Sequence, residues 1–300
     1  MVWNVKGIIT AILTPLTKNG DLCVNCLKEL IEFQLNNGIS GLFIMGTYGE
    51  GLLLSQKVRK KMLEKVIEFV PSKTIILPHV GAADPETAYS LAKYAKDLGY
   101  QAVSSIGPVY YKPSIKGLIN YFNYLAKADL EIIIYNNVGR LKYNITPNLF
   151  EEITRNVPAV VGIKDTSYLA EQLLEYVSKF KSKYFIAGAG DSMIYYTFSI
   201  GADAHICGIS NAFPEVAAKL YKAFLENDMK KALKLQNIAN SIRTMSKKFS
   251  TESPEVMREI LKIRGINAGY PLKIIGGLEQ KEKKKLRTLV KHYLKVIEEV

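Results

Sequence analysis

The chain of 300 residues is poor in several residue types, and each shortage excludes a class of protein. Three cysteines are too few for the disulfide framework of a small secreted domain. No run approaches the roughly 18 apolar residues that a membrane-spanning helix needs. The first residues lack the charged segment and long apolar core of a signal peptide. We therefore predict a cytoplasmic protein that does not bind membranes.

Two of the three cysteines, Cys23 and Cys26, form a Cys-x-x-Cys pair in a stretch of helical periodicity, and Cys207 stands far from them. No second pair of cysteines or histidines accompanies them, and no cluster of histidines and carboxylates has metal-ligand spacing. We expect two thiols one turn apart on a helix, and we predict no metal.

Arginine is also scarce: seven of the 40 basic residues are arginine, and the others are lysine. The net charge of +12 raises the question of a nucleic-acid partner. However, the densest basic runs, Lys57–Lys61 and Lys281–Arg287, lie in helical patterns whose other face is apolar, as solvated helix faces do. A nucleic-acid surface favours a continuous basic stripe with arginine and interleaved aromatics. We therefore predict no nucleic-acid partner.

Short apolar, β-branched segments alternate with amphipathic helical segments along most of the chain. This alternation predicts a parallel sheet, and eight such units predict a closed (β/α)8 TIM barrel. A doubly wound open sheet is the alternative, which is weakened because no Gly-x-Gly-x-x-Gly follows the first strand. The predicted strands are Gly7–Leu13, Gly41–Met45, Thr74–His79, Ala102–Ile106, Glu131–Asn136, Val160–Lys164, Tyr184–Ala187 and Ala204–Cys207.

After Pro214 only helical patterns remain. We predict the eighth barrel helix over 215–226 and further helices over 229–248, 254–263 and 281–299. The chain is therefore divided into a barrel, residues 1–226, and a C-terminal extension of three helices packed on it, residues 227–300.

In a barrel of this kind, catalytic side chains come from the C-terminal ends of the strands. Lys164 closes the apolar run 159–163 at the end of the sixth predicted strand. Lysine is rarely buried without a reason, and removal of its ammonium from water lowers its pKa. A neutral amine can attack a ketone and form a Schiff base. The position alone is equally consistent with a lysine that extends from the strand end into solvent.

Hydroxyl groups at other strand ends favour the catalytic interpretation. Tyr135, Tyr110 and Thr47 follow the fifth, fourth and second predicted strands. A tyrosine within hydrogen-bond reach passes a proton to and from a substrate oxygen, and the N–H groups of the turn 47–49 suit a carboxylate. Ordinary packing would explain each aromatic residue singly. Together they indicate a proton relay beside an amine.

At these same positions the chain resembles the family of dihydrodipicolinate synthase and N-acetylneuraminate lyase, which also includes archaeal 2-keto-3-deoxygluconate aldolases. The resemblance covers essentially the whole chain. It implies a (β/α)8 barrel with three C-terminal helices, usually a homotetramer, that forms a lysine Schiff base with a 2-keto acid and needs no cofactor. The motifs that carry it are GTYGE (46–50), PVYYKP (108–113), YNNVGR (135–140), GIKDTS (162–167) and GADAHICGISNAFP (201–214).

The resemblance implies a role for individual residues of these motifs. Lys164 corresponds to the Schiff-base lysine and Tyr135 to the proton donor and acceptor beside it, while Thr47 and Tyr110 complete the relay. In many members the tyrosine that matches Tyr110 comes from a neighbouring subunit. The substrate-binding positions implied are Gly46, Tyr48 and Gly49 in the carboxylate loop, Gly188 and Ile206 beside pyruvate, and Arg140 on the carboxylate of a second substrate.

Several positions depart from the family pattern. Tyr48 stands where a small hydroxyl residue usually follows the first one, and Val138 replaces a proline. GIKDT is closer to the archaeal sugar-acid aldolases than to the GIKEA of many synthases, whereas Arg140 is typical of the synthases.

We predict a class I aldolase that reversibly cleaves a 2-keto-3-deoxy sugar acid, such as 2-keto-3-deoxygluconate, to pyruvate and an aldehyde such as glyceraldehyde. One alternative is 4-hydroxy-tetrahydrodipicolinate (dihydrodipicolinate) synthase, which joins pyruvate to aspartate semialdehyde. Another is an inactive barrel that senses keto acids, because the phenol of Tyr48 replaces a small hydroxyl in the carboxylate pocket.

Overall fold

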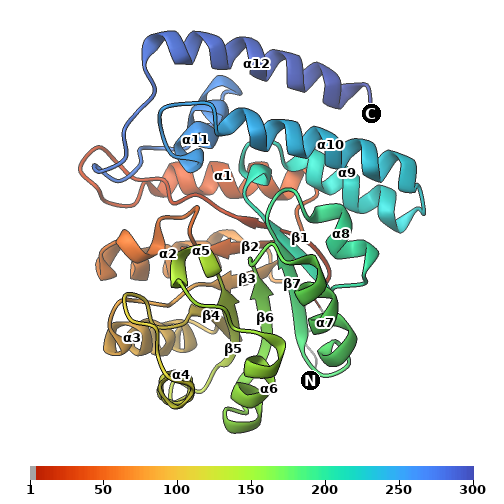
Figure 1. The fold of residues 1–300 in the computed structure, drawn as a ribbon. Helices are drawn as coiled ribbons and strands as arrows, with labels where there is room; N and C mark the ends of the chain where they lie inside the picture. Colours follow the sequence, from red (N-terminus) through yellow and green to blue (C-terminus); the bar gives the residue numbers. More distant parts are fainter. Residues whose placement is uncertain (1–4) are drawn as a thin grey trace.

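The computed structural model describes residues 5–300, so the first four residues of the predicted barrel domain lie outside the described residues. The described chain forms one sheet of eight parallel strands (Figure 1). The predicted strands are confirmed, and their ends differ from the prediction by at most two residues. The strands are β1 (Gly7–Ala11), β2 (Gly41–Ile44), β3 (Ile75–Pro78), β4 (Ala102–Ile106), β5 (Glu131–Asn136), β6 (Val160–Asp165), β7 (Phe185–Ala189) and β8 (Ala204–Cys207).

The sheet closes on itself. The strand order is β3-β2-β1-β8-β7-β6-β5-β4, and a parallel bridge between His79 and Ser104 joins the two ends of this order. The predicted TIM barrel is therefore confirmed, and the doubly wound open sheet is wrong. β1 stops two residues before its predicted end because the N–H of Leu13 donates to Oδ1 of Asn211, 2.9 Å away, instead of to a strand.

The strands were recognisable because both of their faces are covered. In β5, for example, Ile132, Ile133 and Ile134 are all completely buried. In an antiparallel sheet with one wet face, such a run would alternate with polar residues. The continuous apolar pattern thus reflects a lumen filled with side chains on one face and a layer of helices on the other.

The helices begin where the sequence supplies caps. Asp84 accepts a hydrogen bond from the N–H of Thr87, and Thr146 accepts one from Leu149, each immediately before a proline that occupies the first turn. The helices are α1 (Val24–Asn36), α2 (Gln56–Phe69), α3 (Pro85–Asp97), α4 (Ile115–Ala126), α5 (Val138–Leu141), α6 (Pro147–Asn156), α7 (Ala170–Phe180), α8 (Ile194–Ser199), α9 (Pro214–Leu225), α10 (Met229–Ser246), α11 (Ser253–Ile263) and α12 (Gln280–Glu298), with 3-10 turns at η1 (Gly51–Leu53) and η2 (Ile209–Asn211).

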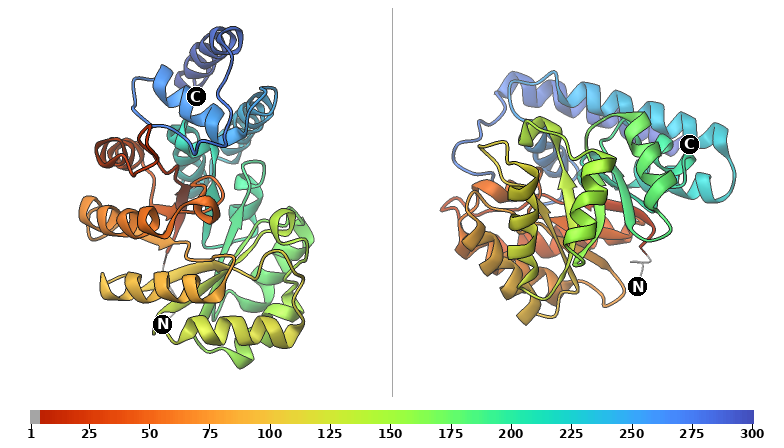
Figure 2. Two further views of the ribbon diagram at one scale, coloured as in Figure 1. Left: turned by 90° about the vertical axis from the view of Figure 1, so that its left-hand side faces the viewer. Right: turned by 60° about the horizontal axis from the view of Figure 1, so that its bottom comes forward.

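The last three helices, α10 to α12, gather on one side of the barrel, and α12 is the outermost of them in Figure 1 and in the left view of Figure 2. The predicted boundary at residue 226 falls between α9 and α10, and the division into two parts stays a prediction. Within residues 5–300, none of the helices combines the length and the apolar content needed to cross a membrane.

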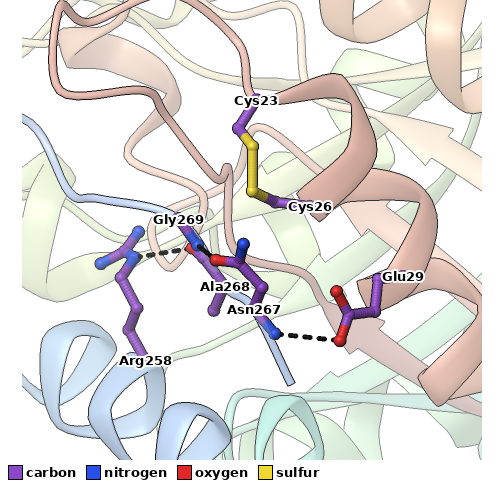
Figure 3. Close-up of a disulfide and its surroundings, with 7 residues drawn as sticks. All are labelled: Cys23, Cys26, Glu29, Arg258, Asn267, Ala268 and Gly269. Carbon is purple, nitrogen blue, oxygen red and sulfur yellow. Dashed lines mark hydrogen bonds between the residues drawn. A yellow bond between two sulfur atoms is a disulfide. The ribbon is translucent and has the colours of Figure 1, made fainter. Parts of the chain in front are cut away.

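The expectation of two free thiols on a helix is wrong. A disulfide joins Cys23 to Cys26 at the start of α1, beside the segment that carries Asn267 (Figure 3). Cys23 is the extended residue before the helix rather than part of it, and it lies three positions from Cys26, so the two sulfurs meet across the first turn. The same spacing suits a reduced pair equally well, which is why the sequence did not decide the matter. Cys207 is a buried free thiol.

We expect thiol titration of the unfolded, unreduced protein to find one reactive thiol for each chain, from Cys207. After treatment with a dithiol reductant the count rises to three, because the Cys23–Cys26 bond opens. In the control variant Cys23→Ser, two thiols react without any reductant. Three thiols in the unreduced wild-type protein would contradict the disulfide.

Candidate active site

Lys164 lies near the end of β6 with its side chain inside the barrel and only 3% exposed. Its Nζ is 3.9 Å from the ring centroid of Phe43 on β2 and 3.8 Å from that of Tyr135 on β5. Tyr135 and Lys164 are register partners on neighbouring strands, so both side chains leave the same face of the sheet. The two aromatic faces attract the ammonium form and offset part of the cost of burying it.

Below the amine, the rings of Phe43, His79 and Tyr135 contact one another edge to face, with centroid separations from 5.5 to 6.0 Å. Both ring nitrogens of His79 are engaged by the backbone: Nδ1 lies 3.2 Å from the carbonyl of Met45, and Nε2 accepts from the N–H of Ile106. Burial holds the pKa of His79 well below its usual value. This histidine therefore packs the barrel as a neutral ring.

The hydroxyl of Tyr135 lies at the centre of a hydrogen-bond cluster. It is 3.1 Å from Oγ1 of Thr47, as the predicted relay requires. It also accepts a 2.7 Å hydrogen bond from Nδ2 of Asn137, a residue that sequence reasoning did not select. The same Nδ2 lies 3.5 Å from Oγ1 of Thr47. The structure thus brings two side chains, from two different loops, onto the phenol.

The surroundings shift the pKa values of both central groups. Burial lowers the pKa of Lys164 below the usual lysine value, although the nearby Tyr135 partly opposes this effect. For Tyr135, burial by itself would raise the pKa, but the charge of Lys164 and the hydrogen bonds with Thr47 and Asn137 outweigh it, so the pKa is lowered. Both groups are therefore easier to deprotonate than they are in water, so the neutral amine and the phenolate are more readily available as nucleophile and as base.

A cavity of about 240 Å³ opens above Lys164 at the C-terminal ends of the strands. Its mouth carries positive charge from Arg140, which follows β5, and from Arg243 and Lys247 of the α10 region. Asp191 is the single carboxylate that lines it within residues 5–300, and its Oδ1 accepts from the N–H groups of Gly208 and Ile209 at the start of η2. The cavity is therefore suited to a small anionic molecule.

Tyr48 lines this cavity beside Thr47. Its ring lies against Gly208 so closely that a Cβ at that glycine would be 2.2 Å from the ring. Burial, and next the carboxylate of Asp191, raises the pKa of Tyr48 well above its usual value, so the phenol stays neutral and keeps its proton to donate. Because the cavity still reaches Lys164, Tyr48 narrows the site without filling it.

The other predicted substrate-binding residues divide into two groups. Arg140 and Ile206 line the cavity with Tyr48. Gly46, Gly49 and Gly188 are not among its lining residues, and a Cβ at Gly188 would meet Thr197 of α8, outside the barrel. At the end of β7 the cavity is lined instead by residues 189–191.

Tyr110 is absent from the cavity of its own chain. It follows β4 in a loop, has a φ of +78°, and is 93% exposed, as the neighbouring Tyr111 largely is. A non-glycine residue in this backbone region is strained and persists where something holds it. Its ring contacts that of Tyr111 edge to face, with the ring centroids 5.0 Å apart, and both rings stay largely exposed.

Several lining residues escaped the sequence prediction. Thr166 and Tyr168 follow β6, and Oγ1 of Thr166 is buried without a hydrogen-bond partner in the described part of the chain. The motif GIKDTS that contains Thr166 was visible, but nothing marked this hydroxyl. Arg243 and Lys247 carried no signal, because they come from the C-terminal extension rather than from a strand end. In residues 5–300 no group of three or more His, Cys, Asp or Glu residues is placed to hold a metal ion.

The C-terminal helices also anchor the loop that carries Thr47. Arg258 of α11 is completely buried and forms ion pairs with Glu50, at 3.0 Å, and with Glu255, at 2.8 Å. Glu50 is the last residue of the GTYGE motif, and its backbone lies in the left-handed region. Its second carboxylate oxygen, Oε2, accepts a hydrogen bond from the N–H of Leu272. The far end of the chain thus fixes the loop at the candidate active site.

We expect Arg258→Met to lower the free energy of unfolding by about 3–5 kcal/mol, because it leaves the buried carboxylates of Glu50 and Glu255 without a cation. Chemical denaturation followed by circular dichroism measures the change. Lys262→Met on the same helix is the matched control: it removes a partly exposed ion pair with Glu259 and costs about 1 kcal/mol or less. Equal losses in the two variants would contradict the anchoring role.

The family model of the dihydrodipicolinate synthetase family matches residues 4–293. The chain belongs to this family. The 4-hydroxy-tetrahydrodipicolinate synthase of Thermotoga neapolitana is 30% identical over 265 residues, 87% of this chain and 89% of its own length. That of Methanoculleus marisnigri is 30% identical over 292 residues, 96% of this chain and 99% of its own length.

Solved structures superpose along nearly the whole chain. The sialic acid aldolase of Ruminococcus gnavus has a TM-score of 0.92 and 25% identity, covering 98% of this chain and 99% of its own. YagE of E. coli K12, solved in complex with pyruvate, has a TM-score of 0.89 and 26% identity, covering 96% and 98%. The chain is thus an enzyme of the class I aldolase and lyase type.

Proposed function

We propose that Lys164 forms a Schiff base with pyruvate and that the enzyme makes and breaks the carbon–carbon bond next to it. The observation that carries this proposal is the buried amine, 3.8 Å from the ring centroid of Tyr135, at the base of a cavity with a cationic mouth. The family comparison supports it, since one solved form of the Ruminococcus gnavus aldolase is a catalytic lysine mutant. The lysine supplies the electron sink itself, so the proposal includes no cofactor.

In the cleavage direction the neutral amine of Lys164 attacks the keto carbon. The phenol of Tyr135 gives its proton to the departing hydroxyl group, which leaves as water, so that a protonated imine and a phenolate result. Tyr135, as the base, takes the proton of the hydroxyl on C4. The C3–C4 bond then breaks, its electron pair flows to the imine nitrogen, and an aldehyde and an enamine of pyruvate result. Protonation of C3 and hydrolysis of the imine release pyruvate and restore the amine.

We propose a 2-keto-3-deoxy sugar acid as the substrate, such as 2-keto-3-deoxygluconate, with glyceraldehyde as the aldehyde product. The unpartnered hydroxyl of Thr166 and the neutral phenol of Tyr48 suit the hydroxyl groups of a sugar acid. The positive charges of Arg140, Arg243 and Lys247 favour a second anion at the far end of the substrate, as in a phosphorylated sugar acid.

The second candidate is condensation of pyruvate with aspartate semialdehyde. Arg140 at the mouth supports it, as do the curated synthases to which the chain is similar. Against it, aspartate semialdehyde brings an ammonium group, and the one carboxylate lining the cavity in residues 5–300, that of Asp191, already accepts two backbone hydrogen bonds through Oδ1. An inactive sensor loses its main support, because Tyr48 leaves the cavity open to Lys164.

We expect borohydride to trap a pyruvate adduct on Lys164, detected by intact mass and peptide mapping, and we expect none in Lys164→Ala.

Steady-state cleavage of 2-keto-3-deoxygluconate, free and 6-phosphorylated, is then compared with condensation of pyruvate and aspartate semialdehyde. The sugar acid should give the higher kcat/KM, with the phosphorylated form favoured. In Arg243→Met this preference for phosphate should fall by about tenfold, since one charge-assisted contact is lost.

An adduct that persists in Lys164→Ala would overturn the Schiff-base role. A higher kcat/KM with aspartate semialdehyde would instead replace the sugar acid by the second candidate and leave the Schiff base in place.

We also propose that Tyr110 completes the relay in the active site of a second subunit, within a dimer of a homotetramer. This would explain why a strained tyrosine stands exposed beside Tyr111 in the single chain. Its position after β4 leaves it outside the cavity that contains Lys164 in the same chain.

Subunit mixing tests this arrangement. Tyr110→Phe and Lys164→Ala should each lower activity by at least about a hundredfold. Refolded together in equal amounts, they should recover about a quarter of wild-type activity, because half of the dimers then carry one site with both residues intact. No recovery, with dimers present by light scattering, would place Tyr110 in its own subunit's site or outside the reaction.

A further inference from the structure

We propose that Asn137 is a positioning residue of the reaction: its side-chain amide fixes the direction in which Tyr135 and Thr47 pass a proton. Nδ2 of Asn137 donates to the Tyr135 hydroxyl at 2.7 Å and lies 3.5 Å from Oγ1 of Thr47. One amide that does not titrate therefore faces both oxygens of the relay. The inference rests on the proposed Schiff-base function.

The contact has a directional consequence. A phenol has one proton to donate, and Asn137 supplies a hydrogen to the oxygen of Tyr135 from one side. The phenol's own proton then points away from Asn137, toward Oγ1 of Thr47 at 3.1 Å or toward the substrate. Once Tyr135 has lost this proton, the amide hydrogen remains on the phenolate oxygen, where a hydrogen bond to a charged acceptor is stronger than one to a neutral acceptor.

Asn137 lies at a position where its side chain could cap a helix, but it does not do so. It is the residue before α5, where asparagine commonly accepts a hydrogen bond from the first turn, yet its side chain caps nothing there. Its backbone carbonyl already accepts from Arg140 and Leu141, so the turn is closed without the side chain. The amide is therefore committed to Tyr135 and Thr47 rather than to its own helix.

Three charged or titratable groups face Tyr135, and none of them accounts for the acid limb of the pH profile. Tyr135 is therefore the group whose protonation the amide controls. Lys164, from β6, carries its charge as a protonated imine once the Schiff base forms, and loss of that proton would lower kcat on the alkaline side of the profile rather than on the acid limb. Burial keeps His79, after β3, neutral by lowering its pKa, and keeps Tyr168, after β6, neutral by raising its pKa. The acid limb of the kcat profile in the enzyme–substrate complex thus reports Tyr135, and loss of the Asn137 hydrogen bond moves this limb upward.

The test compares Asn137→Leu, which has nearly the same shape and no donor, with Asn137→Asp, which places a negative charge beside the phenol. The pH dependence of kcat is measured for cleavage of 2-keto-3-deoxygluconate 6-phosphate, or for condensation of pyruvate with aspartate semialdehyde if that reaction proves faster. We expect the acid limb to move up by about one pH unit in the leucine variant, with kcat near neutral pH about tenfold lower and KM within about twofold. The aspartate variant should move it further, because a like charge disfavours the phenolate.

Asn37→Leu is the matched control. Asn37 makes a side-chain hydrogen bond of similar length, 2.8 Å to the carbonyl of Phe33, at the end of α1. Its profile should coincide with that of the wild-type protein. Thermal unfolding of all variants shows whether they are folded, and the near-isosteric aspartate variant keeps the test open if the leucine variant fails to fold.

Two results would overturn the inference: an unchanged kcat in both Asn137 variants, or a lower kcat with the acid limb unmoved, as a merely structural role would give. Borohydride trapping of pyruvate separates this failure from failure of the proposed function. If the wild-type protein and both variants form the Lys164 adduct while the acid limb of the kcat profile does not move, only the role of Asn137 is disproved. If the wild-type protein forms no adduct, the proposed Schiff-base function itself is disproved.

Discussion

The burial of one amine constrains the rest of this structure. Lys164 is removed from water at the end of β6, between the rings of Phe43 and Tyr135. Burying a charge is expensive unless something compensates it, and here two aromatic faces compensate the ammonium form only in part. The result is an amine that gives up its proton more readily than a lysine in solvent. The lowered pKa of this candidate nucleophile thus arises from packing rather than from a dedicated base.

A second requirement is that polar groups reach the reacting atoms from different parts of the chain. The barrel brings Thr47, Tyr135 and Lys164 together because parallel strands end at the same rim. The C-terminal helices add Arg243 to the mouth and, through Arg258, hold the end of the GTYGE loop. The C-terminal helices therefore line the candidate active site as well as covering the barrel.

Much of this architecture follows from local sequence. The strands are apolar on both faces, so eight runs stood out against amphipathic helices, and capping residues such as Asp84 marked helix starts. Lys164 was recognisable because a lysine at the end of a buried strand is rare. The disulfide was not predictable, because the spacing of Cys23 and Cys26 suits thiols and disulfide alike.

By itself, the sequence determined the barrel, its strands, the candidate nucleophile and the hydroxyl groups around it, because these depend on periodicity and on strand ends. Only the tertiary structure decided which side chains meet. It turned the amide of Asn137 toward Tyr135 rather than toward its own helix, brought Arg243 from α10 to the cavity, and left Tyr110 outside it. Side-chain direction depends on the packing of segments far apart in the chain, and no local pattern encodes that packing.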